Sequence, residues 1–472
     1  TRFLSIAIGG GQNINEFGSN SQSVFTNPAQ MVSRHVAVIG AGAAGLVAAR
    51  GLKREGHRVI VFERNREIGG TWAYQDDAES DPSGRDPSRA TVHSSLYKSL
   101  RTNIPREIMG FKDFPFSPTD QSFDSRRFPR HDEVLRYLKD FSRRYPLHGA
   151  LRLQTEVVSV QREDQHWRVN SKRRGFDSLT DELYDAVVVC NGHYAEPRLA
   201  EVPGIGSWPG REIHSHNYRA PEPFKDLVVV LIGYSSSGKD ISRELAGFAR
   251  EVHVASHGVP NERIELEIGY DNLWIHSMIE QANGDGTVRF RNGKTVAADV
   301  IMHCTGYWYS FPFLEEKRFV EVEDNRVWPL YKHVFPPAVA PSLSFVGIPT
   351  KIAPFFLFEL QSKWIAGVLS GRIGLASREE MMDEVRAVSA ELEESNVPRR
   401  HAHYLGNSQF EYNDWLAEEC GCSGSEKWRG LMYIENSKNK NGRPDTYRDE
   451  WEDDHLVAEA YIDFKKFSHF TS

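Results

Sequence analysis

Apolar and polar positions follow two different periods in the first structured part of the chain. His35–Ile39 is a short apolar run with several β-branched residues, and it predicts a buried parallel strand. Leu46–Glu55 has helical composition and stops before Gly56, and Arg58–Phe62 predicts a second strand. Together they form a strand–turn–helix–strand unit of about 30 residues, the building block of parallel α/β sheets.

The same order of elements returns deep in the chain. Leu227–Ile232 predicts a strand, Lys239–Phe248 a helix and Glu251–Ala255 the next strand. Asp185–Cys190 and Asp299–Cys304 are later apolar runs, one for each half, and both close on small residues. We therefore predict an α/β fold with two Rossmann-like dinucleotide-binding domains, which repeat one architecture.

A glycine-rich turn joins the first predicted strand to its helix. Its residues are Gly40, Ala41, Gly42, Ala43, Ala44 and Gly45. The three glycines allow a tight turn, a close approach to a pyrophosphate and close packing of helix on strand, and the helix N-terminus offers free N–H groups. Glu63 ends the next strand, where a carboxylate accepts hydrogen bonds from ribose hydroxyls and disfavours a 2′-phosphate. The turn predicts a site for FAD or NAD rather than NADP.

The second turn departs from this pattern at its centre. Its residues are Gly233, Tyr234, Ser235, Ser236, Ser237 and Gly238. Ser235 replaces the middle glycine and adds a hydroxyl beside the phosphates. Ser256 and His257 follow the next strand in place of an acid, and a neutral or weakly basic end tolerates the extra phosphate of NADP. The prediction is an NADP site, and the alternative is a vestigial turn.

Two dinucleotide sites in one chain imply hydride transfer from a nicotinamide to a flavin, so FAD and NADPH are the expected cofactors. This pairing leaves reductases and oxygenases open. We predict that residues 31–207 and 326–472 form an FAD-binding domain into which an NADP-binding domain, residues 208–325, is inserted. Residues 1–30 read as an unstructured leader or an added segment, and the last hundred residues as a helical tail that includes Arg378–Glu394.

Composition narrows the class of protein. The chain has 472 residues with 40% hydrophobic and 26% charged, a globular profile, and a length that suggests two or three domains. Its net charge of -8 gives no reason to expect nucleic acid or an anionic membrane as partner. No run approaches the 18 or so apolar residues of a membrane span, so none is expected.

Four cysteines are too few for a disulfide framework, which fits a reducing, cytoplasmic compartment. No C-x-x-C occurs, so a flavin disulfide reductase would lack its redox pair. Cys420 and Cys422 form a C-x-C with His401 and His403 upstream, but these spacings match no common zinc pattern. No metal site is predicted.

One segment between the two units carries the most specific signal. Residues 208–218, from Trp208 to Tyr218, match F-x-G-x-x-x-H-x-x-x-Y with Trp208 in place of the first Phe. With this motif, the first glycine turn, Gly69–Trp72 and Cys304–Tyr307, the chain resembles the class B flavin-containing monooxygenases from about residue 31 to 467. By that resemblance, His214 and Tyr218 organise the linker and NADP rather than the chemistry.

Finer details resemble the plant S-oxygenating branch of that family, the glucosinolate and S-alk(en)yl-cysteine S-oxygenases. They are Leu100–Asn103, Phe114–Phe116, Tyr307–Phe313, Phe358–Trp364 and Thr446–Trp451. The resemblance implies that Thr71 and Trp72 lie near the flavin and that Asn103 sits beside its reactive face and the nicotinamide, as the one catalytic candidate. Gly70 and Val158 complete the set of expected cofactor-binding residues.

The implied reaction is oxygenation of a soft nucleophile. By resemblance, NADPH reduces FAD, O2 adds at the flavin C4a carbon, and this hydroperoxide gives its distal oxygen to a thioether sulfur. A relative that acts on a keto substrate, such as an auxin-forming or Baeyer–Villiger-type enzyme, remains an alternative. An uncoupled NADPH oxidase is another, and a non-catalytic role is a third. The sequence predicts neither the exact sulfur substrate nor the oligomeric state.

Overall fold

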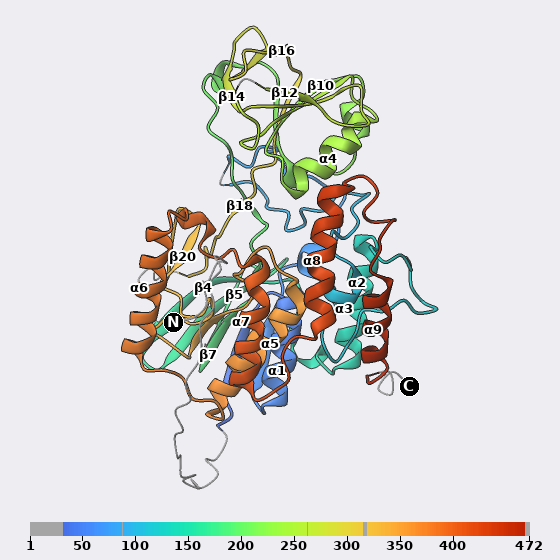
Figure 1. Ribbon diagram of the computed structural model, residues 1–472. Coiled ribbons are helices and arrows are strands. Elements are labelled where there is room, and N and C mark those ends of the chain that lie inside the picture. Colours follow the sequence, from blue (N-terminus) through green and yellow to red (C-terminus); the bar gives the residue numbers. More distant parts are fainter. Residues whose placement is uncertain (1–31, 87, 262, 315–318, 468–472) are drawn as a thin grey trace.

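The structure is a computed structural model that describes residues 32–86, 88–261, 263–314 and 319–467, so the expected leader, residues 1–30, lies outside the described residues. Two sheets of mainly parallel strands dominate it (Figure 1). The smaller unit, with β10 and α4, sits above a larger body that holds both ends of the described chain. Helices coloured orange and red cover one side of that body.

The five-stranded sheet of the larger body has the strand order β21-β7-β1-β2-β3 and is parallel throughout. Its bounds are β1 His35–Ile39, β2 Arg58–Phe62, β3 Leu151–Arg152, β7 Ala186–Val189 and β21 Leu343–Phe345. Helices α1 (Ala43–Arg54) and α5 (Pro354–Ser370) pack against one face. The antiparallel sheet β4 (Thr155–Glu163), β5 (His166–Arg173) and β6 (Leu179–Tyr184) closes the core on the other face.

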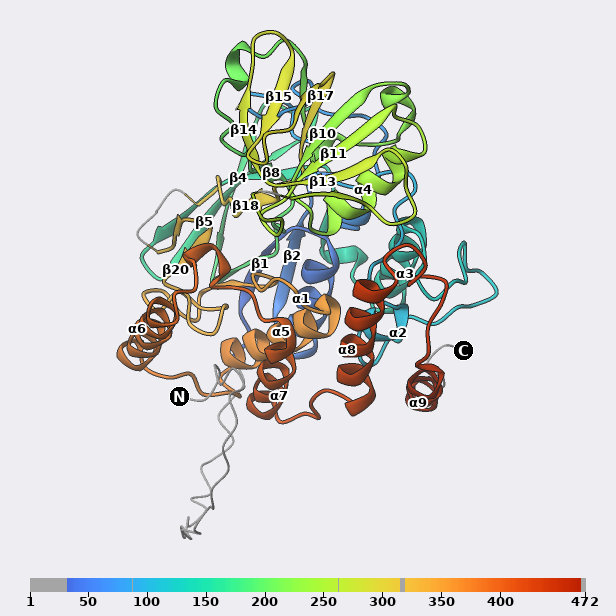
Figure 2. The ribbon, with the colours of Figure 1, turned by 45° about the horizontal axis from the view of Figure 1, so that its top comes forward.

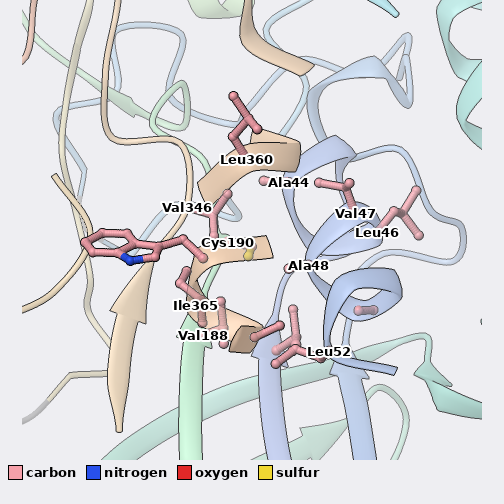
Figure 3. Close-up of a cluster of buried hydrophobic side chains, with 14 of the residues drawn as sticks. Ala44, Leu46, Val47, Ala48, Leu52, Val188, Cys190, Val346, Leu360 and Ile365 are labelled. Carbon is pink, nitrogen blue, oxygen red and sulfur yellow. The ribbon is translucent and has the colours of Figure 1, made fainter. Parts of the chain in front are cut away.

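The core on the helical face is a seam between α1 and α5 (Figure 3). Ala44 and Ala48 of α1 point toward Cys190, just after β7, and toward Leu360 and Ile365 of α5. Small residues on α1 allow the two helices to approach closely, and α5 is buried along nearly its whole length. The seam holds α1, and so the turn before it, in a fixed position against the sheet.

The second sheet has the order β12-β13-β11-β10-β17-β9. Its strands are β9 Arg211–His214, β10 Val228–Ile232, β11 Glu251–Ala255, β12 Ile264–Leu266, β13 Leu273–His276 and β17 Val300–His303. Helix α4 (Ser236–Ala246) packs on β10, β11 and β13. All six strands come from residues between β7 and β21 of the first sheet, which confirms an α/β fold with one dinucleotide-binding unit inserted in the other.

Predicted and observed elements agree closely at strands and less closely at helix starts. The strands at 35–39, 58–62 and 251–255 match residue for residue, and the helix over Arg378–Glu394 is α6. The helices predicted from Leu46 and Lys239 begin three residues earlier, as α1 and α4. The reason is that each glycine-rich turn already has its last residues in the first helical turn, so turn and helix overlap.

The C-terminal tail is helical, as predicted. It comprises α6, α7 (Gln409–Cys420), α8 (Lys427–Gly442) and α9 (Asp454–Phe464). Ser377 and Glu380 form a reciprocal capping box at the start of α6. Helices α8 and α9 lie beside α2 (Arg106–Met109) and α3 (His131–Arg144), where Ile108 and Met432 share an apolar cluster (Figures 1 and 2).

Shorter strands complete the described chain. They are β8 Glu196–Pro197, β14 Ile279–Ala282, β15 Thr287–Phe290, β16 Thr295–Ala297, β18 Tyr307–Trp308, β19 Glu321–Glu323 and β20 Arg326–Trp328. Among the helices of the described residues, none combines the length and the apolar character needed to cross a membrane.

Both glycine-rich turns rest on the same close backbone contacts. Gly40 has φ +103°, and a Cβ there would lie 2.5 Å from the Cys190 carbonyl oxygen; a Cβ on Gly45 would overlap the Gly40 carbonyl oxygen. In the second turn Gly233 has φ +102°, with Cys304 in the corresponding place at 2.6 Å, and a Cβ on Gly238 would overlap the Gly233 carbonyl oxygen. The serine at the middle position therefore does not disturb the close contacts of the two outer glycines in the second turn.

Gly45→Ala should destabilise the protein, because backbone atoms must move to admit the methyl group. We expect a loss of about 2 kcal/mol or more in the free energy of unfolding, measured by urea denaturation. Gly149→Ala is the matched control, since a Cβ at Gly149 meets nothing within 4 Å. Equal effects of the two substitutions would contradict the packing argument.

Candidate functional site

The first turn is open to a phosphate group. Gly42 is the N-cap of α1 and no side chain caps the helix, so its first N–H groups remain available to a ligand. Gly70 lies against Gly42, with its hypothetical Cβ 3.0 Å from the Gly42 Cα, and the Gly69 N–H donates to the Ala41 carbonyl at 3.0 Å. The predicted segment Gly70-Thr71-Trp72 therefore flanks the turn directly.

Glu63 occupies the place expected for a ribose-binding acid. One carboxylate oxygen accepts from the Ala41 N–H at 2.9 Å, and the other accepts from the Asn65 N–H at 2.8 Å. Burial raises the pKa of Glu63 above its usual value, and these two hydrogen bonds act in the opposite direction. The carboxylate is thus held in one orientation at the end of β2, beside the turn.

The second turn is also uncapped. Ser235 is the N-cap of α4, yet its hydroxyl makes no capping hydrogen bond, so the N–H groups of the first helical turn stay available. The Ser235 Oγ instead accepts from Lys351 Nζ at 3.3 Å. Lys351 follows β21, so a side chain of the larger unit reaches the middle of the second turn.

Ser256 and His257 follow β11, and no acid stands at this strand end. The Ser256 N–H donates to the His276 carbonyl at 2.9 Å, and its hydroxyl accepts from the Gly258 N–H at 3.2 Å. His257 is exposed next to it. No carboxylate follows the strand here to repel a 2′-phosphate.

Asn103 lies where the two units and the tail meet. Its carbonyl accepts from Asn436 Nδ2 of α8 at 3.1 Å, and its side chain is exposed. The neighbouring Thr102 carbonyl accepts from Arg448 Nε at 3.0 Å, and Arg448 also pairs with Asp240 of α4 at 2.6 Å. These contacts place Asn103 at the junction between the second unit and α8.

Thr71, Trp72 and Val158 lie on the larger unit. The Thr71 carbonyl accepts from Ser94 Oγ at 3.2 Å, and Trp72 is half-buried against the α1 core. Val158 is the extra residue of a β-bulge in β4, with a side chain that is 44% exposed. A bulge leaves backbone groups outside the sheet ladder, so a cofactor contact at Val158 would use the backbone.

The residues of the 208–218 motif are structural. Burial lowers the pKa of His214 to about 3, and its Nε2 lies 3.0 Å from the Gly306 carbonyl oxygen. Tyr218 is fully buried and donates to Glu244 of α4 at 2.7 Å. Trp208 Nε1 donates to the Gly286 carbonyl at 3.2 Å. The motif ties the linker to the second sheet and its helix, and the expected role of His214 and Tyr218 in organising NADP stays a prediction.

Sequence reasoning missed one wall of the site, the face of α8 formed by Tyr433, Asn436 and Lys440. Tyr433 donates to the Lys351 carbonyl at 3.0 Å. Asn436 is 8% exposed, and its Oδ1 has no hydrogen-bond partner among the described residues, so it can bind a polar ligand group. The spacing of three and four residues put these side chains on one helix face, but nothing local indicated what that face contacts.

Lysines gather at this wall. Burial lowers the pKa of Lys440 to about 8, and Arg448, Lys351 and Lys239 lower it too, against the opposing effect of Asp240. Lys440 has no carboxylate within ion-pair distance in the described part of the chain. Such a cluster of exposed and half-buried positive charge favours a bound anion, and a dinucleotide carries several negative phosphates.

Comparison with known proteins identifies the family of this chain. The family model described as flavin-binding monooxygenase-like matches residues 33–260 and 257–426. The Arabidopsis thaliana protein named flavin-containing monooxygenase FMO GS-OX-like 3 is 58% identical over 441 residues, 92% of this chain and 98% of that protein.

Solved structures agree as well. The S-allyl-L-cysteine S-oxygenase from Allium sativum is 57% identical with a TM-score of 0.91, over 93% of this chain and 100% of that one. Tmm from Pelagibacter sp. strain HTCC7211 is 25% identical with a TM-score of 0.75, over 88% and 93%. With a glycine-rich turn in each unit and matches across almost its whole length, the chain belongs to the flavin-binding monooxygenase-like family and is an FAD- and NADPH-dependent monooxygenase.

Proposed function

We propose that this enzyme oxygenates thioethers to sulfoxides, with S-alk(en)yl-cysteine-type compounds as its substrates. The support is the 57% identity, across 93% of this chain, to an enzyme named for S-oxygenation of S-allyl-L-cysteine. The geometric support is the contact of Lys351 with Ser235, which joins the second glycine-rich turn to the larger unit.

Thioether oxygenation requires little proton transfer by protein side chains. A sulfur lone pair attacks an electrophilic oxygen without losing a proton, so no paired acid and base is needed. Bound FAD, once reduced by NADPH, supplies the activation of O2. The residues of the chain hold both nucleotides, orient the thioether and keep water out.

Asn103 is the candidate for the one polar contact at the reacting atoms. Its backbone is anchored by Asn436, so the exposed side-chain amide projects from a fixed point at the junction. An amide can donate one hydrogen bond and accept another, which suits a site that must steady a reactive oxygen species and a nicotinamide amide.

The lysines around the second turn are candidates for binding the phosphates of NADPH. Lys351 already reaches Ser235, and Lys239 and Lys440 approach the same region from α4 and α8. We further propose a cytoplasmic location, supported by four free cysteines, and a role for O2 as co-substrate with no nucleic acid partner. A keto substrate and uncoupled NADPH oxidation are the competing activities.

The first test is a substrate panel. Purified enzyme with FAD and NADPH should convert S-allyl-L-cysteine and S-methyl-L-cysteine to sulfoxides, with nearly one sulfoxide formed per NADPH oxidised, as measured by mass spectrometry. An α-keto acid and a cyclic ketone should yield no product. NADPH consumption that yields only hydrogen peroxide with every thioether would overturn the proposal.

Asn103→Ala should retain FAD but lose coupling, because the amide no longer steadies the reactive oxygen. We expect sulfoxide formation to fall by about 100-fold while NADPH is still oxidised and hydrogen peroxide accumulates. Asn439→Ala, on the same helix as Asn436 but bonded to the Tyr447 and Glu450 carbonyls, is a control for general damage to this region. Normal coupling in Asn103→Ala would remove the residue from the site.

Lys351→Met should weaken NADP+ binding by about 10-fold, the value of one charge-assisted hydrogen bond. The dissociation constant can be measured directly from the flavin fluorescence change, without turnover. Lys438→Met is the control, since Lys438 is largely exposed and pairs with Glu435. Unchanged NADP+ affinity in Lys351→Met would separate this lysine from the phosphates.

The lowered pKa of Lys440 predicts that NADP+ affinity depends on pH. Its pKa is about 8 in the free protein, and a bound phosphate would raise it by favouring the charged form. NADP+ affinity should therefore be full below pH 8 and fall as pH rises above it, and Lys440→Met should flatten this profile between pH 7 and 9. A wild-type profile that is already flat over that interval would contradict the assignment.

A further inference from the structure

The C-x-C motif at the end of α7 brings two thiols together. Cys420 is the last residue of the helix, and Gly421 turns the chain in the left-handed conformation with φ 65° and ψ 36°. The Cys422 N–H then donates to the Ala417 carbonyl at 2.9 Å, which folds Cys422 back over the helix end. In this compact turn the Cys420 thiol donates to the Leu360 carbonyl at 3.8 Å and also interacts with the Cys422 sulfur.

Both cysteines line a cavity of about 200 Å³ between α1, α5 and the end of α7. Four cationic side chains, Arg50, Arg54, Lys363 and Arg372, line it with two acidic ones, Glu55 and Glu359, and both Arg50 and Arg54 also pair with Asp113. Glu359 pairs with Lys363 at 2.7 Å, and Glu55 pairs with Arg372. The cavity therefore places ion-paired cations beside the thiols and gives small molecules a way to reach them.

This setting favours a thiolate on Cys422. The hydrogen bond from Cys420 lowers the pKa of Cys422 to about 6, and Lys363 and Lys112 act in the same direction against burial. Lys112 is fixed nearby, since its Nζ donates to the carbonyls of Ser423 and Gly424 at 2.9 and 2.6 Å. The contrast is Cys190, whose pKa burial alone raises well above the usual value.

We propose that Cys420 and Cys422 form a redox-active pair whose substrate is a hydroperoxide, such as hydrogen peroxide. The Cys422 thiolate attacks one peroxide oxygen, the O–O bond breaks, and the products are a sulfenic acid on Cys422 and hydroxide. The Cys420 thiol then attacks the Cys422 sulfur, an S–S bond forms, and water leaves. Overall the two thiols lose two electrons and two hydrogens, and the peroxide is reduced to two waters.

The backbone at Gly421 permits this ring to close. An intact disulfide needs Cα atoms roughly 4.4–6.8 Å apart, and an extended chain would separate residues i and i+2 by about 6.6 Å, close to that limit. The left-handed turn at Gly421 shortens the separation, and its hypothetical Cβ meets nothing within 4 Å, so the turn has room to adjust. Among the described residues, the two sulfurs do not belong to any group of three potential metal ligands.

The test is thiol mapping of the holoenzyme treated with hydrogen peroxide, without NADPH or thioether. After denaturation, alkylation and digestion, mass spectrometry should find the 420–422 peptide two hydrogen masses lighter and unalkylated, and dithiothreitol should restore alkylation. Peptides with Cys190 and Cys304 are internal controls and should remain fully alkylated. An alkylated 420–422 peptide after treatment, or equal oxidation of all four cysteines, would overturn the proposal.

Two variants separate the steps. Cys420→Ser should stop at the sulfenic acid, trapped on Cys422 by dimedone, whereas Cys422→Ser should leave Cys420 unmodified. The alkylation rate of wild-type Cys422 should rise with a midpoint near pH 6, compared with about 8.5 for an ordinary cysteine. Lys363→Gln should shift that midpoint upward, and a midpoint that stays at 8.5 in the wild type would contradict the thiolate. Because no NADPH is present, these outcomes are independent of the substrate assignment.

Discussion

Two backbone contacts without room for a side chain underlie the architecture. In each unit a glycine at the start of the turn presses on the carbonyl that ends a neighbouring strand, Cys190 in one case and Cys304 in the other. A second glycine lets the helix rise directly from that turn. These contacts position the N-termini of α1 and α4, which attract phosphate groups. The electrostatics of both nucleotide sites therefore depend on the lack of a Cβ atom at these glycines.

In the NADPH unit the two outer glycines, Gly233 and Gly238, preserve the conformation of the turn although the middle glycine is replaced. Ser235 breaks the glycine pattern, yet φ at Gly233 matches φ at Gly40 within a degree. The serine hydroxyl contacts a lysine from the other unit instead of capping its own helix. The serine at this position departs from the glycine pattern of the sequence, but in the folded protein it links the two units.

Much of the fold could be predicted because its signals are local. β-Branched runs indicated the strands, and the turns with their following helices indicated both nucleotide units, although α1 and α4 begin inside the turns. The family resemblance is confirmed by matches over almost the whole chain. The α8 wall with Asn436 and Lys440 could not be predicted, because its role arises only from a contact between residues hundreds of positions apart. Cofactor contacts of Val158 and the domain boundaries stay predictions.

The segment after α8 connects elements that lie much earlier in the sequence. Arg448 links Asp240 of the NADPH unit to the Thr102 carbonyl, Asp445 binds Arg243, and Asp449 pairs with Arg101. Since a ribosome makes the chain from its N-terminus, both sheets can form before this segment emerges. The last ion pairs between the two units are thus formed late, and a product shortened near residue 442 would keep contacts such as Lys351 with Ser235 but lose the three ion pairs of this segment.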